Sequence, residues 1–338
     1  MKKSFGVLPS GEQASLYTIS CGKITATVTD YGAHLVSVLV PDRQGIVADV
    51  VLGYDDANGY RTGNCFFGAT VGRNANRIGG ASFELNGKTV KIPANENGNN
   101  LHSGPDYYHL RMWQVVFHDE FGIKLRLESP DGDQGYPGNA VIEVTYELDS
   151  LGGLHIIYDA HCDQDTIFNL TNHSYFNLAG HDKPEQCMEQ KLTIPSNYFT
   201  PDDALNIPTG ELRSVADTPF DFRRAKPIGR DINEDYDQLH LQGGYDHNFV
   251  VDGVPCAILE SPDSRRTMVV FTDCPGVQFY AGNYIVDEIG KGGIHYTKRT
   301  GICLETQFYP DALHNPDWPQ PVTRAGDAYH SETIYKFE

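Results

Sequence analysis

Short runs in which apolar and polar residues alternate follow one another along most of the chain. In residues 14–40 these runs are rich in β-branched residues and are broken at Gly22, at Gly32 and at a Pro41-Asp42 turn signal. A period of two residues is typical of half-buried strands, and glycine with proline marks the turns between them. We therefore predict consecutive β-strands in this segment.

The same pattern continues almost to the C-terminus, with turn signals placed between paired runs. The signals are Asn86-Gly87 in SFELNGKTVKI, Phe121-Gly122 in WQVVFHDEFGIKLRLESP and Gly152-Gly153 in AVIEVTYELDSLGGLHIIYDAHC, and TMVVFTD and TIYKF are further strand-like runs. Residues of this kind between two alternating runs favour β-hairpins. We predict that hairpin follows hairpin.

No segment keeps a helical apolar period for more than about three turns, and strands and helices do not alternate regularly. The 34 glycines and 19 prolines provide many turns. No low-complexity linker or internal repeat divides the sequence. We expect an all-β fold, a large antiparallel β-sandwich, with a single domain over residues 1–338.

The composition excludes several classes of partner. The chain has 338 residues, 40% of them hydrophobic, so it can bury a sizeable core, and 45 acidic residues against 26 Lys and Arg give a formal charge of -19. Such a charge repels phosphate backbones and anionic lipid. We expect neither a nucleic acid nor a membrane partner.

Two lysines near the N-terminus are not followed by an apolar run of signal-peptide length, and no stretch of about 18 apolar residues occurs, so we expect a cytoplasmic protein. The seven cysteines are scattered and none forms a Cys-x-x-Cys pair. We expect reduced, buried thiols rather than disulfides or a structural zinc site.

Polar residues gather in a few segments between the predicted strands, where binding groups usually lie on a rigid β scaffold. These segments are residues 72–77 (GRNANR), 95–104 (NENGNNLHSG), 244–249 (GYDHNF) and 305–315 (ETQFYPDALHN). A fifth, residues 168–178 (FNLTNHSYFNL), sets His173 among three asparagines within an apolar, strand-like pattern. Its donors and acceptors suit a polyhydroxylated ligand, although a structural histidine in a sheet would give the same pattern.

Together these segments offer an acid-base set of two imidazoles, two carboxylates and a guanidinium. The candidates are Arg77, His102, His173, Asp246 and Glu305, with Asn76, Tyr175, Gln278 and Phe279 as possible helpers. Ordinary pKa values of about 6.5 for histidine and about 4.3 for glutamate leave a window near neutral pH in which one donates a proton and the other accepts it.

Glu305 is the strongest candidate, because it lies in the apolar run GICLETQFYP, where an ionised carboxylate is costly unless it is paired or lines a cleft. Asp246 follows Gly243-Gly244, where aspartate is common for turn reasons, and Arg77 could merely pair with a surface acid.

Motifs for other chemistries are missing. The glycine-rich stretches at residues 68–72 and 290–293 match neither a P-loop nor a dinucleotide fingerprint, and no Gly-x-Ser-x-Gly elbow, His-x-His or His-Glu-x-x-His occurs. We expect no cofactor and no metal.

Five ordered motifs, FGATVGRNANRI, NNLHSG, TNHSYFNL, YDHNF and LETQFYPDALHN, resemble the aldose 1-epimerase (galactose mutarotase) family over essentially the whole chain. The resemblance implies the galactose mutarotase-like supersandwich with an open sugar cleft, and a cofactor-free interconversion of the α and β anomers of free hexoses. It also implies roles: Glu305 as general base, His173 as general acid, His102 as a second catalytic or positioning imidazole, sugar contacts from Asn76, Arg77, Asp246 and Gln278, and Tyr175 and Phe279 beside them.

Asn74 departs from the resemblance, since relatives often have an apolar or aromatic residue there, and this leaves sugar specificity open. Three alternatives also stay open: a non-catalytic sugar-binding sandwich, a glycoside hydrolase with Glu305 and Asp246 as its carboxylates, and a phosphosugar epimerase. The last would need more cationic groups than Arg73 and Arg77 in the motif loops. The preferred hexose is not fixed by the sequence, nor is the choice between monomer and homodimer.

Overall fold

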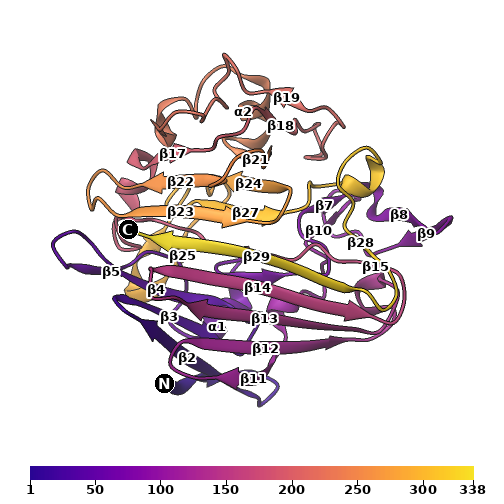
Figure 1. Cartoon of the computed structure of the whole chain (residues 1–338), viewed down its shortest axis with the longest axis horizontal. Coiled ribbons are helices and arrows are strands. Elements are labelled where there is room, and N and C mark those ends of the chain that lie inside the picture. Colours follow the sequence, from indigo (N-terminus) through magenta and orange to yellow (C-terminus); the bar gives the residue numbers. More distant parts are fainter.

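Antiparallel sheets make up nearly all the regular structure in the computed structural model, which describes residues 1–338 (Figure 1). The largest sheet has nine strands. The strand nearest the C-terminus, residues 328–337, lies between two strands from earlier in the chain, residues 153–162 and 267–272. In sheet order the strands are β11 (Gln114–His118), β12 (Gly122–Ser129), β13 (Ala140–Leu148), β14 (Gly153–Cys162), β29 (Ala328–Phe337), β23 (Thr267–Thr272), β22 (Ala257–Glu260), β17 (Lys191–Thr193) and β20 (Lys226–Pro227).

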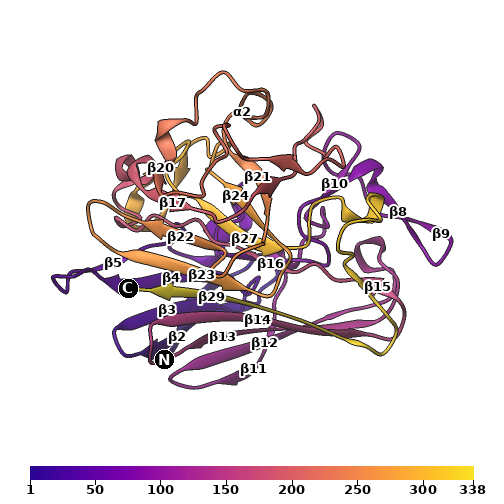
Figure 2. The ribbon, with the colours of Figure 1, turned by 45° about the horizontal axis from the view of Figure 1, so that its top comes forward.

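A second sheet of five strands comes from the N-terminal segment and packs against β12 and β13, as Figures 1 and 2 both show. Its strands are β1 (Lys2–Val7), β2 (Gln13–Cys21), β3 (Ile24–Thr29), β4 (Leu35–Pro41) and β5 (Val47–Asp49). The inward residues of the two sheets meet in one core cluster of 55 buried residues that includes Ala26, Ile142 and Val144. The fold is thus the large antiparallel β-sandwich that the alternating pattern predicts.

A third sheet, also of five strands, forms from the C-terminal half (Figure 2). Its strands are β19 (Arg213–Ser214), β18 (Tyr198–Phe199), β21 (Asp246–Val250), β24 (Gly276–Tyr280) and β27 (Cys303–Gln307). Five two-stranded pairs complete the sheets: β6 (Ala69–Val71) with β16 (Thr171–His173), β7 (Arg77–Ile78) with β10 (Asn100–Leu101), β8 (Ser82–Leu85) with β9 (Lys88–Lys91), β15 (Thr166–Ile167) with β28 (Val322–Thr323), and β25 (Glu288–Ile289) with β26 (His295–Tyr296).

Helices are few and short. The two α-helices are α1 (Ala57–Thr62) and α2 (Asp237–Gln242). The 3₁₀ turns are Gly79–Ala81, Tyr108–Leu110, Asp133–Gly135, Pro184–Glu189, Ile228–Arg230, Lys291–Gly293 and Ala312–His314. No helix has the length and apolar character that crossing a bilayer requires.

The predicted hairpins are confirmed. Asn86 and Gly87 join β8 to β9 with positive φ values of 52° and 71°, which a type I′ turn needs at both central positions. Strands β13 and β14 pair in register from Ala140 with Cys162 to Leu148 with Leu154, so Gly152 and Gly153 lie at the turn and the start of β14.

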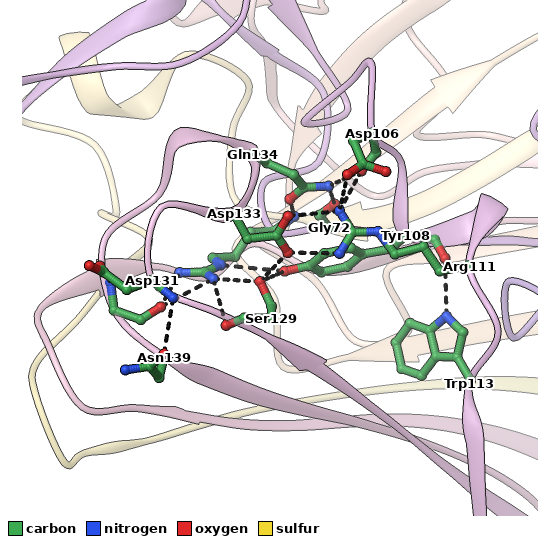
Figure 3. A network of polar contacts seen from close by, with 12 residues as sticks. Gly72, Asp106, Tyr108, Arg111, Trp113, Ser129, Asp131, Asp133, Gln134 and Asn139 are labelled. Carbon is green, nitrogen blue, oxygen red and sulfur yellow. Dashed lines mark hydrogen bonds and ion pairs between the residues drawn. The ribbon is translucent and has the colours of Figure 1, made fainter.

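The segment that carries Asn76 and Arg77 is fixed to the nine-stranded sheet through Arg73. The Arg73 side chain is fully buried and donates to Ser129 Oγ at 2.6 Å and to the carbonyl oxygen of Pro137 at 2.9 Å. Ser129 Oγ in turn donates to Asp133 at 2.6 Å, and Asp133 pairs with Arg111 at 2.7 Å. Figure 3 shows the Ser129, Asp133 and Arg111 part of this network. A buried guanidinium with this many acceptors anchors the polar loop that follows it.

Candidate active site

Seven of the nine predicted site residues meet in one cleft of about 340 Å³. The cleft lies where β16 and β27 come together with the polar loops around β7 and β10 and with the start of β21. The seven residues are Asn76, Arg77, His102, His173, Tyr175, Asp246 and Glu305. Segments separated by more than two hundred positions in the sequence therefore form one site.

The other two predicted residues are neighbours on β24, and the alternation of a strand separates them. Gln278 lies opposite Glu305 in the strand register and donates its amide to Asp246 Oδ1 at 2.8 Å, so it borders the site. Phe279 is fully buried and packs on Tyr245, with ring centroids 5.1 Å apart, in the main core cluster. The structure does not bring Phe279 into the cleft, because adjacent strand residues face opposite sides of a sheet.

Glu305 lies at the floor of the cleft in β27, a strand with no exposed residue. Its side chain is 2% exposed, and Oε1 lies 3.6 Å from Nε2 of His173. The second carboxyl oxygen, Oε2, has no hydrogen-bond partner within the protein. A buried oxygen without a partner is costly unless a ligand supplies one.

The His173 ring is held on β16 by aromatic stacking and by its two nitrogens. Phe66 and Tyr175 both lie nearly parallel to it, with centroids 5.5 Å and 5.0 Å from the imidazole. Nδ1 lies 3.4 Å from Sγ of Cys303, and Nε2 faces Glu305. The ring therefore has a fixed orientation, with one nitrogen facing the carboxyl group of Glu305.

Burial reverses the usual order of the two pKa values, in which that of histidine lies above that of glutamate. Loss of water lowers the pKa of His173 to about 4. Burial, together with the negative charge of Asp246, raises the pKa of Glu305 well above its usual range, and Arg77 opposes this only in part. Both shifts favour a neutral imidazole beside a protonated carboxyl group, whereas the sequence suggested a charged histidine beside an ionised glutamate.

His102 presents a neutral N–H group. The backbone N–H of Asn76 donates to its Nδ1 at 3.0 Å, so the ring hydrogen lies on Nε2. Burial lowers the pKa of His102 well below its usual range, and the nearby His173 and Arg77 add to this effect. His102 is therefore a hydrogen-bond donor without a charge.

Arg77 is held by an acid that sequence reasoning did not single out. Glu96 binds its guanidinium with two hydrogen bonds, 2.6 Å to Nε and 3.1 Å to Nη2, and also lines the cleft. Three carboxyl groups, Glu96, Asp246 and Glu305, thus face one cation. This balance suits neutral hydroxyl groups and disfavours a phosphate, and Arg73 is fully buried outside the cleft.

Further residues that the motifs did not indicate also line the cleft. Tyr280 and Tyr284 stack at 6.2 Å, and Tyr284 is 54% exposed. The remaining lining residues that were not predicted are Asn64, Cys65, Phe66, Glu96, Leu101 and Asn206. Glu96 could have been found, since it is the acid in a loop already selected for its polarity, whereas aromatic side chains at the rim carry no such signal.

His173, Cys303 and Glu305 are all residue types that bind metals, and their ligand atoms lie within 4.8 Å of one another. Nδ1 faces the thiol and Nε2 faces the carboxyl group, so the ring stands between these two groups. Because the two nitrogens face different groups, this arrangement does not favour a chelate.

Comparison with known proteins agrees with the geometry. The family model described as aldose 1-epimerase matches residues 15–336. Galactose mutarotase from Bos taurus is 39% identical over 339 residues, covering 98% of this chain and 97% of the relative, and aldose 1-epimerase from Escherichia coli (strain K12) is 36% identical over 337 residues, covering 97% and 96%.

Among solved structures, the GalM/aldose epimerase homologue from C. elegans superposes with a TM-score of 0.89 at 32% identity, covering 96% of this chain and 99% of that one. Both the sequence and the fold are therefore matched from end to end. The chain belongs to the aldose 1-epimerase family.

Proposed function

We propose that this protein interconverts the α and β anomers of free aldohexoses such as D-galactose and D-glucose. The observation that carries the proposal is the buried pair of Glu305 and His173, 3.6 Å apart at the floor of a cleft rich in hydrogen-bonding groups. Relatives that share 36–39% of their residues with this chain are named galactose mutarotase and aldose 1-epimerase, which supports the same reaction here.

The reaction requires an acid and a base that act together. Anomers interconvert when the bond between C1 and the ring oxygen opens, so a base must take the proton of the C1 hydroxyl while an acid protonates the ring oxygen. Glu305 serves as the base and His173 as the acid. The aldehyde then turns about the C1–C2 bond, and ring closure reverses both proton transfers.

The resting pair holds the one proton that this scheme needs, but holds it on Glu305. Transfer from Oε1 to Nε2 of His173 gives a carboxylate and an imidazolium, which are the base and the acid of the ring-opening step. The hydroxyl groups of a bound sugar favour this transfer, because they form hydrogen bonds to the two charges, which are otherwise costly in a buried site. Each turnover restores the pair, so no cofactor is consumed.

The surrounding residues hold the sugar. Arg77, fixed by Glu96, and Asp246, fixed by Gln278, have defined directions for bonding to ring hydroxyls, as does Asn76. The uncharged Nε2–H of His102 donates to the C1 oxygen as it becomes a carbonyl.

Polarimetry tests the proposal. We expect the optical rotation of freshly dissolved α-D-galactose and α-D-glucose, at neutral pH with EDTA present, to relax faster with the protein than without it. The ratio of the catalysed rates for the two sugars gives the sugar preference. Methyl α-D-galactoside, which has no free C1 hydroxyl, stays unchanged. Relaxation of both sugars at the uncatalysed rate with folded protein contradicts the proposal, and release of methanol from the glycoside indicates a hydrolase instead.

A further inference from the structure

Cys303 contacts His173 but does not line the cleft. Cys303 and Glu305 are two residues apart on β27, so their side chains leave the same face of the strand, and the His173 ring spans the gap between them. Sγ lies 3.4 Å from Nδ1, and Oε1 of Glu305 lies 3.6 Å from Nε2. Cys303 is fully buried and is not among the residues that line the cleft, so its thiol has no path to a sugar.

With a neutral imidazole and a protonated carboxyl group, the three side chains carry three polar hydrogens: one on the imidazole, one on the carboxyl group and one on the thiol. If the thiol donated to Nδ1, Nε2–H would face Oε1, and the carboxyl hydrogen would be left on Oε2, which has no partner. If Nδ1–H donates to sulfur instead, the carboxyl hydrogen on Oε1 faces the lone pair of Nε2. Only the S–H group, the weakest donor of the three, then lacks a partner.

We propose that Cys303 is a positioning residue, whose sulfur accepts the Nδ1–H of His173 and so keeps Nε2 open to the proton of Glu305. This inference rests on the proposed function. With the hydrogen on Nδ1, the proton moves from Oε1 to Nε2 and forms the acid and base of ring opening. With the hydrogen on Nε2, the same transfer is blocked.

A thiol suits this position because it directs the ring without charging it. Burial raises the pKa of Cys303 well above its usual range, so the sulfur stays neutral. A carboxylate in its place would instead stabilise the charged imidazolium form of His173, as the aspartate of a serine-protease triad does once its histidine has taken up a proton.

Two substitutions separate hydrogen bonding from packing. Cys303→Ser keeps an acceptor for Nδ1–H but is smaller, whereas Cys303→Val is somewhat larger, stays apolar and removes the acceptor. We expect kcat of Cys303→Val to fall about 10- to 100-fold, the range typical when a group that orients a metal-binding histidine is lost, with KM changed less than about twofold. Cys303→Ser retains most of kcat.

Cys256 provides the matched control, because it is another buried thiol with one hydrogen bond, 3.3 Å to the carbonyl oxygen of Val270, and it lies outside the cleft. Cys256→Ser and Cys256→Val are expected to leave kcat unchanged.

Long-range ¹H–¹⁵N correlation spectra of histidine-labelled protein give a readout that does not depend on activity. The His173 signals are assigned by their absence from His173→Gln. We expect the Nδ1–H tautomer in the wild type and the Nε2–H tautomer in Cys303→Val.

The inference would be overturned if Cys303→Val were as active as Cys303→Ser. It would also be overturned if His173 of the wild type were found in the Nε2–H form. The wild-type spectrum tests the position of the His173 hydrogen even if both variants fail to fold. A wild type without mutarotase activity contradicts the proposed function, whereas the tautomer still tests the hydrogen bond itself.

Discussion

The His173 imidazole has almost no contact with water, and its nitrogens face a thiol and a carboxyl group rather than a fixed charge. The rings that orient it therefore also remove the solvent that would stabilise its cation. Because Glu305 is buried in the same way, the pair titrates as a unit with one proton between the two groups over a wide pH range.

This coupling predicts the pH dependence of kcat/KM. The active pair carries one proton, so activity falls as the pH drops through about 4, where His173 takes up a second proton at its lowered pKa. Activity also falls at alkaline pH, where the pair loses its last proton at the raised pKa of Glu305. Initial rates from pH 3.5 to 9.5 check this, and an acidic limb near the ordinary histidine value would mean that His173 titrates as a solvated group.

Glu96 provides a second prediction at the residue scale. In Glu96→Gln the guanidinium of Arg77 loses a charged partner and turns toward Asp246, so both groups bind the sugar less well. A charge-assisted hydrogen bond is worth about 1.5–3 kcal/mol, hence KM is expected to rise about tenfold or more, with a smaller change in kcat.

Steady-state kinetics with Glu143→Gln as the control checks this, because Glu143 also pairs with an arginine, Arg126, but outside the cleft. Equal KM values for Glu96→Gln and the wild type would show that Arg77 needs no partner to hold its direction.

At the scale of elements, the sequence predicted those features that local pattern determines. The alternation of β13 and β14 and the Asn86-Gly87 turn could be read directly, because period and turn chemistry are local. The position of β29 between β14 and β23 could not, since no local signal specifies which distant strands pair, and β14 and β29 are more than a hundred residues apart.

The same contrast holds for the candidate site. The motif residues were found because polar groups in loops and an acid in an apolar strand are visible in the sequence. Phe279 and Gln278 were both predicted to lie near the sugar. Adjacent residues of one strand face opposite sides of the sheet, so only Gln278 borders the site and Phe279 is buried in the core. Cys303 was read as apolar packing, because its contact with His173 exists only when β16 and β27 meet.

The buried network around Arg73 leads to a prediction about the loop that precedes β7. Arg73→Met keeps much of the volume but removes the guanidinium hydrogen bonds to Ser129 Oγ and to the carbonyl oxygen of Pro137. We expect the free energy of unfolding in urea to fall by about 3 kcal/mol. The exposed Arg223, paired with Asp221, is the control, and Arg223→Met should cost less than about 1 kcal/mol. Equal losses would mean that the network does not anchor the loop.

At the scale of the whole molecule, the nine-stranded sheet and the N-terminal sheet share one core, and the cleft collects residues from Asn64 to Glu305. The negative formal charge of -19 is continued inside the cleft, where the acidic Glu96 and Asp246 act on a single guanidinium, that of Arg77. Free sugars meet no barrier there, but anions do.

We therefore expect kcat/KM for D-glucose 6-phosphate to lie about 100-fold below that for D-glucose at low salt, because placing like charges together costs several kcal/mol. The difference should shrink as salt screens the exposed part of the field. A phosphosugar that is used as well as the free sugar would contradict this view of the cleft.

The central claim, that Glu305 and His173 open the sugar ring, is tested most directly by exchange NMR between the two C1 signals of ¹³C1-labelled D-galactose, with EDTA present. We predict strong exchange cross-peaks with the wild type, and a rate at least about 100-fold lower with folded Glu305→Gln, which cannot act as the base. Exchange as fast with Glu305→Gln as with the wild type would contradict the account.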